Sequence, residues 1–230
     1  MTIDNPLISR YHAVKSHLDQ LNHTHHAHAT LIAVSKTHSA SAIGQLATLG
    51  QRDFGENYLQ ESLPKIHALK DLGLTWHYIG HIQRNKTRDI ATHFDWVQTV
   101  ERDIIAKRLN DQRPDDLPPL NVLIQLNIDD ETNKSGCQTH ELNELINTII
   151  ALPRLTLRGL MIIPAKEGSD AFARTADIFD KMKEKYDLPH FDTLSMGMSG
   201  DMADAVAHGS TMVRVGTAIF GQRDYPVSHP

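Results

Sequence analysis

Short apolar runs alternate with helix-like segments along the chain, and this alternation limits the fold more than any single motif. Each of eight strand-like runs is followed by a helix or a helical turn: 31–34, 53–55, 76–80, 94–100, 120–128, 155–163, 193–196 and 211–215. Alternation without consecutive strands predicts a parallel sheet, and eight units predict closure into a single (β/α)8 barrel. An open doubly wound sheet is the alternative. The turn after the first run, 35–37, lacks the Gly-rich pattern of that fold.

Helical periodicity fills the segments between these runs. Helices are expected over 6–21, 39–50, 85–92, 101–110, 140–152, 170–186 and 201–208. A further helix should end near Leu72, and a short terminal helix follows Gly221 or is absent.

The connector before the first strand is rich in histidine: His23, His25, His26 and His28. Such a group can bind a metal, but no carboxylate or cysteine is interleaved with these side chains. We therefore expect a solvent-exposed connector rather than a metal site.

Composition narrows the class of protein. A 230-residue chain that is 40% hydrophobic and 22% charged is typical of a soluble globular protein. No apolar run approaches the roughly 20 residues that span a bilayer, and Met1–Arg10 lacks the features of a signal peptide. The net charge of −5 argues against nucleic-acid binding. A single cysteine, Cys137, excludes an internal disulfide, which is typical of a protein in the reducing cytoplasm. From these observations together, we expect a cytoplasmic protein without membrane or nucleic-acid partners.

Lys36 follows the apolar run Leu31–Val34 almost directly. In a parallel barrel the carboxyl ends of the strands meet at the face that carries the site. A lysine amine in a pocket of low dielectric is favoured as the neutral nucleophile and can attack a carbonyl. Taken on this run alone, a lysine that simply extends into water is the alternative.

Two later strand ends carry turns of the kind that bind anions. Met196–Asp201 is a small-residue turn with the Ser199 hydroxyl, and it leads into a helix. Gly216 and Thr217 follow the last strand, where the glycine lets the backbone approach closely. Barrels frequently hold phosphate with the loops after strands seven and eight, so both turns indicate a phosphate site, although the glycines alone would also suit tight turns.

Arg214 lies in the otherwise apolar run 211–215, two residues before the second turn. It either pairs with a structural carboxylate or faces a ligand atom in the barrel mouth. A nucleophilic lysine, a phosphate cradle and an arginine at one barrel mouth together indicate pyridoxal 5′-phosphate (PLP), held as a Schiff base.

A set of short stretches, in order along nearly the whole chain, is characteristic of one family. These stretches are Ala33–Lys36, Phe54–Tyr58, Trp76–Gly80 with Gln83 and Asn85-Lys86, Asn133–Gly136, Arg158–Met161, Leu194–Ser199 with Asp201, and Gly209–Gly221. Taken as a set, they make the chain resemble the pyridoxal phosphate homeostasis proteins.

The resemblance implies a fold and a set of site residues. The fold is a barrel like the amino-terminal domain of alanine racemase (PLP fold type III), formed by residues 1–230 as one PLP-binding domain. The implied roles are PLP on Lys36, phosphate contacts from Ser199, Gly216 and Thr217, Arg214 facing the pyridine nitrogen, and Asn57 near the ring.

The same resemblance implies a binding and delivery protein in PLP homeostasis rather than an enzyme. An arginine at the ring nitrogen makes PLP a weaker electron sink than an aspartate does. The racemases complete their site with a carboxyl-terminal β domain and a dimer partner, whereas this sequence ends at Pro230, about where the barrel closes. An open site and a monomer are therefore expected, with PLP-dependent apo-enzymes as acceptors. The alternatives are a PLP-dependent amino-acid racemase and a Schiff-base aldolase that uses no PLP.

Four further residues have a functional and a structural interpretation. Lys134 is either a second amine that receives the aldehyde or a loop lysine paired with nearby acids, and we favour the pairing. Cys137 is expected to be an ordinary thiol and His77 a core histidine. Met161 either packs against the cofactor ring or fills the core.

Overall fold

The computed structural model describes residues 5–131, 134–165 and 170–222. Asn133 of one characteristic stretch and Pro230 lie outside these ranges. The described chain contains a closed barrel of parallel strands in sequential order. The strands are β1 (Thr30–Val34), β2 (Asp53–Glu56), β3 (Thr75–Tyr78), β4 (Trp96–Val100), β5 (Leu120–Gln125), β6 (Leu155–Met161), β7 (Thr193–Ser195) and β8 (Met212–Val215). The predicted eight-stranded barrel is confirmed, and the open sheet is wrong.

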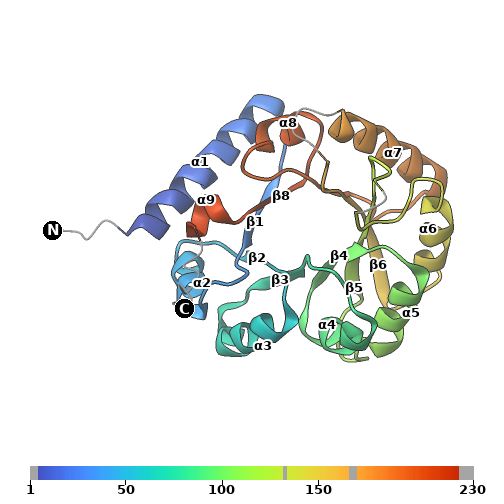
Figure 1. Cartoon of the computed structure of the whole chain (residues 1–230), viewed down its shortest axis with the longest axis horizontal. Coiled ribbons are helices and arrows are strands. Elements are labelled where there is room, and N and C mark those ends of the chain that lie inside the picture. Colours follow the sequence, from blue (N-terminus) through green and yellow to red (C-terminus); the bar gives the residue numbers. More distant parts are fainter. Residues whose placement is uncertain (1–4, 132–133, 166–169, 223–230) are drawn as a thin grey trace, which may run out of the picture.

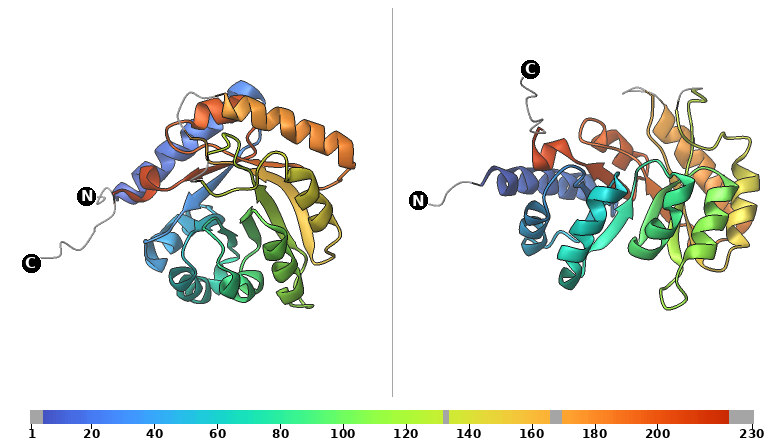
Figure 2. Two further views of the ribbon diagram at one scale, coloured as in Figure 1. Left: turned by 45° about the vertical axis from the view of Figure 1, so that its right-hand side comes forward. Right: turned by 60° about the horizontal axis from the view of Figure 1, so that its bottom comes forward.

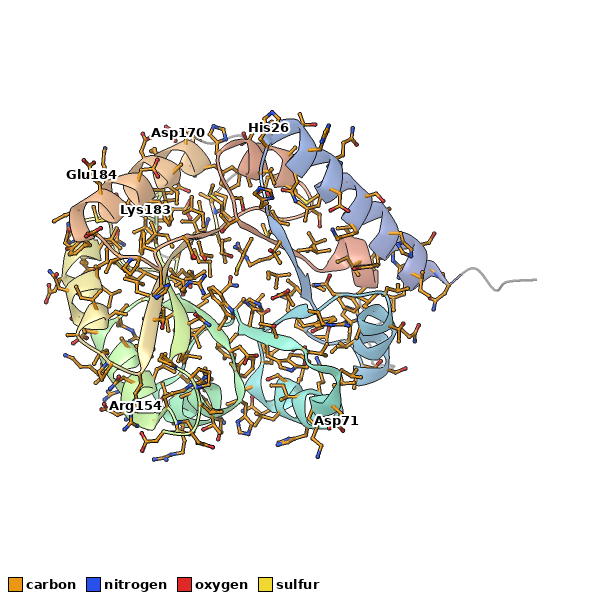
Figure 3. All side chains as sticks on the ribbon, turned by 180° about the vertical axis from the view of Figure 1, so that it is seen from behind. His26, Asp71, Arg154, Asp170, Lys183 and Glu184 are labelled. Carbon is orange, nitrogen blue, oxygen red and sulfur yellow. The ribbon has the colours of Figure 1, made fainter. Side chains whose placement is uncertain are left out.

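The helices form a ring around these strands (Figure 1). They are α1 (Pro6–His25), α2 (Ala40–Thr48), α3 (Leu59–Ala68), α4 (Thr87–His93), α5 (Asp103–Gln112), α6 (Leu142–Ile150), α7 (Ala171–Tyr186), α8 (Met202–Ala207) and α9 (Thr217–Phe220), with 3₁₀ turns η1 (Lys70–Leu72) and η2 (Arg84–Lys86). Charged side chains such as Arg154, Lys183 and Glu184 lie on the outer rim (Figure 3). No helix in the described ranges has the length and apolar character needed to cross a membrane.

Pairing of the first and last strands closes the barrel. Ile32 of β1 is in register with Arg214 of β8, and Val34 of β1 is in register with Gly55 of β2. Helix α1 packs against both α8 and α9, which brings the two ends of the described chain to one side of the molecule (Figure 2). The strand ends of β7, β8, β1 and β2 are therefore neighbours.

Side chains alternate between the barrel interior and the layer beneath the helices. The larger core cluster, with Phe54, Val97 and Ile124 among its members, packs against helix residues such as Ile43 and Ile146. A small second cluster contains Trp96, Leu123 and Met161, with Met212 packed against it. Met161 is almost fully buried in that cluster, so it fills the core.

Several predicted boundaries differ from the structure. Helix α1 continues to His25, so His23 and His25 lie in its last turn rather than in a connector. The Asn22 amide explains this ending, because it bonds both the backbone N–H and the carbonyl of Ala29 beyond the helix. Helix α9 ends at Phe220, and the terminal helix considered after Gly221 would fall on residues outside the described ranges. The helix predicted to end near Leu72 is split into α3 and η1.

The histidine-rich segment lies in the last turn of α1 and the residues that follow it. The described residues contain no group of three or more His, Cys, Asp or Glu side chains arranged to hold a metal ion. His26 adopts a left-handed conformation (φ 51°) and ends the helix.

Candidate functional site

Lys36 directly follows Ser35, a buried residue that hydrogen-bonds to Glu56 of β2. The Ser35 hydroxyl donates to Glu56 Oε1 over 2.6 Å. Lys65 of α3 donates its Nζ to the Ser35 carbonyl at 2.9 Å and to the same Glu56 oxygen at 2.8 Å. Burial raises the pKa of Glu56, and the hydrogen bonds from Lys65 and Ser35 oppose that rise. This buried ion pair fixes the backbone from which Lys36 extends.

Lys36 itself is half-buried at the barrel mouth. A Cβ placed on Gly55 would lie 3.1 Å from Ile32 Cγ2 and 3.5 Å from Val34 Cγ2, so these β1 side chains face the interior together. Lys36 lies two residues beyond Val34, in the turn that follows β1. The next residue, Thr37, has φ 67° and donates its N–H to Glu61 at 2.9 Å, which turns the chain away immediately after the lysine.

Arg214 is a buried cation on the neighbouring strand. Its side chain is 5% exposed. The guanidinium donates to Ser195 Oγ at 2.7 Å and to the Ile162 carbonyl at 2.8 Å. Within the described ranges it forms no ion pair with a carboxylate. Burial lowers its pKa to about 10 while the charge of Asp201 opposes the shift, so the group remains cationic at neutral pH.

The turns after β7 and β8 are joined to each other. Gly197 has φ 93°, and a Cβ there would lie 2.5 Å from Ala205 Cβ, so this position requires glycine. Its carbonyl accepts the backbone N–H of Arg214 at 3.0 Å. A Cβ on Gly216 would lie 3.4 Å from Val34, which places the second turn against the end of β1. Ser199 and Thr217 are exposed on these turns.

Arg10 of α1 supports the second turn from outside the barrel. Its guanidinium donates to the carbonyls of Ile219 at 2.9 Å and Phe220 at 3.1 Å. The ring of Phe220 stacks on His38, with 4.6 Å between centroids, so α9 is tied to both α1 and the chain after Lys36.

Asn57 follows β2 and presents an unused acceptor. Its Oδ1 is buried and has no hydrogen-bond partner among the described residues. Its carbonyl lies 2.1 Å from the place a Cβ on Gly80 would take, so the β3 turn fits only with glycine. A buried polar atom without a partner costs free energy unless a ligand or water satisfies it.

The six predicted site residues come from four strand ends that are neighbours in the barrel. Lys36 follows β1, Asn57 follows β2, Ser199 follows β7, and Arg214, Gly216 and Thr217 belong to β8 and its turn. The expected gathering of these strand ends at one part of the barrel mouth is therefore present.

The other candidate residues lie elsewhere or have structural roles. Lys134 Nζ lies 3.3 Å from the Glu131 carboxylate, the pairing that we favoured. It borders a cavity of about 580 Å³ together with His81 and Glu101. Burial raises the pKa of Cys137 to about 12, as expected for an unreactive thiol. His77 is fully buried, as predicted.

Most of this chain matches proteins of known families. Residues 10–224 match the family described as alanine racemase, N-terminal domain. A pyridoxal phosphate homeostasis protein of Escherichia coli (strain K12) is 57% identical over 204 residues, which cover 85% of this chain and 86% of the relative. This chain belongs to the pyridoxal phosphate homeostasis family.

Solved structures agree with this family assignment. PipY of Synechococcus elongatus, solved with PLP bound, has a TM-score of 0.81 and 33% identity, and the match covers 94% of this chain and 100% of PipY. Alanine racemase of Corynebacterium glutamicum has a TM-score of 0.66 at 18% identity, covering 93% of this chain and 62% of the racemase. The racemase likeness concerns the fold alone.

The residues present in this member of the family fit PLP. The unpartnered Asn57 oxygen and the buried guanidinium of Arg214 are polar groups that a ligand can satisfy. The Ser195 hydroxyl that accepts from Arg214 donates in turn to Gln98 Oε1 over 2.6 Å. The sequence did not reveal Lys65 and Gln98 as supporting residues, nor the contacts of Ser195 within its characteristic stretch, because these roles depend on side chains from different strands and helices. Glu56 was within a characteristic stretch, but its partner was not evident.

Proposed function

We propose that this protein binds PLP as a Schiff base on Lys36 and serves in intracellular PLP homeostasis and delivery, with little or no catalysis. The observation that carries the proposal is the grouping of a half-buried lysine, a buried arginine and two glycine-containing turns at adjoining strand ends. The proposed contacts are Ser199, Gly216 and Thr217 to the phosphate, Arg214 to the ring nitrogen, and Asn57 near the ring.

The chemistry of the site favours binding and release. When bound, PLP supplies an aldehyde whose carbon forms a C=N bond with the Lys36 nitrogen as water leaves. A guanidinium can only donate hydrogen bonds and does not give up its proton, so Arg214 would leave the ring nitrogen unprotonated. Ser199 and Thr217 are exposed, so this mouth excludes little water.

Four further properties belong to the same proposal. Residues 1–230 act as one PLP-binding barrel domain, and the protein is a cytoplasmic monomer. PLP-dependent apo-enzymes are the acceptors of the cofactor. A closed barrel has no free strand edge for pairing with a second copy, which supports the monomer. The single buried Cys137 is in keeping with a reducing compartment.

The visible absorption spectrum of the purified protein tests the central claim. PLP added to the wild type should give a yellow band that borohydride abolishes, leaving a phosphopyridoxyl group on Lys36. Lys36→Ala should lack the band, and Lys134→Ala, the matched change at another half-buried lysine, should keep it. A colourless wild type, or a band retained by Lys36→Ala, would refute the assignment. Labelling only after a sugar aldehyde or ketone is added would instead support the PLP-free aldolase.

An amino-acid racemase remains the second candidate because the fold is shared with alanine racemase. Chiral chromatography of L-alanine incubated with the PLP-loaded protein distinguishes the two. Our proposal predicts no D-alanine above the level formed by Lys36→Ala. Multiple turnovers that depend on Lys36 would identify an enzyme.

A further inference from the structure

A line of polar side chains crosses the barrel interior and ends at Arg214. Asp53 opens β2, His77 lies in β3, Gln98 in β4 and Ser195 in β7. His77, Gln98 and Ser195 are completely buried, whereas 26% of the Asp53 side chain is exposed. Four hydrogen bonds of 2.6 to 3.0 Å connect these residues in sequence to Arg214.

The chemistry of arginine sets the direction of every bond in this line. A guanidinium has no acceptor, so Ser195 Oγ accepts from Arg214 Nη1 at 2.7 Å. The serine hydroxyl donates to Gln98 Oε1, and their 2.6 Å separation is typical of an O–H···O bond. The amide then presents its Nε2 to His77 Nδ1 at 3.0 Å.

The histidine step completes the same direction. His77 Nδ1 accepts from Gln98, so the ring proton lies on Nε2 and is donated to Asp53 Oδ1 at 3.0 Å. Packing holds the imidazole in place, because it stacks on Trp96 with 5.5 Å between centroids. All four donors therefore point from Arg214 toward the carboxylate of Asp53.

We propose that Asp53, His77, Gln98 and Ser195 form one hydrogen-bond relay that positions the Arg214 guanidinium for the ring nitrogen of PLP. Asp53 acts in it as the remote counter-charge. This inference rests on the proposed function for the identity of the ligand. A buried cation with no carboxylate in hydrogen-bond contact among the described residues is costly. The charge of Asp201 stabilises Arg214 from a distance, and a line of bonds polarised in one direction toward the Asp53 carboxylate offsets more of that cost. A carboxylate in direct contact would instead compete with the ligand for the same N–H groups.

The test begins with the protein free of PLP. Nitrogen-15 NMR at mildly alkaline pH should show the His77 ring as the Nε2–H tautomer. Ser195→Ala removes the hydroxyl between Arg214 and Gln98, so the His77 and Arg214 side-chain resonances should both move. The control is Ser210→Ala, because Ser210 is a buried serine whose hydroxyl bonds only to backbone carbonyls. An Nδ1–H tautomer in the wild type, or equal spectra for the two variants, would overturn the relay.

PLP titration then measures the positioning role. Ser195→Ala should weaken PLP binding about tenfold, the size expected for one lost hydrogen bond to a charged group, and should shift the absorption maximum of the bound cofactor. Ser195→Thr keeps the hydroxyl and should restore both values, while Ser210→Ala should match the wild type. Asp53→Asn keeps an acceptor but removes the charge, and it should weaken binding without changing the His77 tautomer.

The outcomes separate this inference from the function on which it rests. A wild type that binds no PLP would refute the proposed function and the ligand named here, while the nitrogen spectra would still decide whether the relay exists. A wild type that binds PLP, with Ser195→Ala unchanged in affinity and absorption, would overturn the positioning role alone.

Discussion

Replacing Lys65 with methionine should make the stability of this protein depend on the charge of Glu56. The change removes the 2.8 Å ion pair and the 2.9 Å bond to the Ser35 carbonyl. Within the part of the chain that the structure describes, Glu56 Oε2 has no partner, so the carboxylate would keep only the bond from the Ser35 hydroxyl. Breaking a buried ion pair on one side costs about 3–5 kcal/mol of unfolding free energy.

Protonation of the unpaired Glu56 carboxyl limits the loss of unfolding free energy in Lys65→Met. Relative to the ordinary value of 4.5, protonating Glu56 at pH 7 costs about 3.5 kcal/mol, and at pH 5 less than about 1 kcal/mol. Because the pKa of Glu56 is raised in the folded state, its contribution to stability is present below the unfolded pKa and is lost as pH rises through the folded pKa. Lys65→Met should therefore be much more destabilising at pH 7 than at pH 5.

Urea unfolding followed by circular dichroism at the two pH values measures this difference. Lys107→Met is the matched control, since Lys107 pairs with Asp103 at the same 2.8 Å but both side chains are about half exposed. It should cost less than about 1 kcal/mol at either pH. Adding Glu56→Gln to Lys65→Met should abolish the pH dependence. Equal losses for the two lysine variants, or a Lys65→Met loss that does not change with pH, would refute the reasoning.

Three further predictions concern single positions. Gly80→Ala should cost about 1–3 kcal/mol by urea unfolding, because its Cβ meets the Asn57 carbonyl, whereas Gly44→Ala inside α2 has room and should be neutral or stabilising. An effect of equal size for both glycines would contradict this. Iodoacetamide at pH 8 should leave Cys137 unmodified in the folded protein and alkylate it in urea, since burial raises its pKa to about 12 and so suppresses the thiolate. Rapid labelling of the folded protein would show that the thiol is accessible. Arg10→Ala should lower the unfolding free energy by about 1–2 kcal/mol through loss of two bonds to α9, and unchanged hydrogen exchange in α9 would show that Arg10 does not hold it.

The sequence predicted the barrel because each strand carries its own signal. An apolar run such as Leu31–Val34 must be buried, and its place between helices specifies a parallel sheet. The last turn of α1 was not predictable in this way. His23 and His25 add no apolar residue to the helical pattern, and the sequence does not show the two hydrogen bonds between the Asn22 amide and the backbone of Ala29 beyond the helix.

The sequence predicted those residues of the candidate site that carry a charge at the end of an apolar strand. Lys36 and Arg214 stand out as charges in or beside apolar runs, and the structure places Lys36 just after β1 and Arg214 on β8, the strand that pairs with β1. The supporting residues gave no such signal. Gln98 and Ser195 are far apart in the sequence and ordinary in their local context, and only the closed barrel brings their side chains within 2.6 Å.

Pairing of β1 with β8 has a consequence for the nascent chain on the ribosome. Lys36 leaves the ribosome well before Arg214 and the turn at Gly216, which lie much later in the sequence. Domains generally fold as their chain emerges, and contacts between distant segments form slowly. A nascent chain therefore carries a reactive amine but no place for a phosphate. Retention of a phosphorylated aldehyde would thus mark molecules in which β8 has closed the barrel, and chains truncated before β8 would fail to retain it.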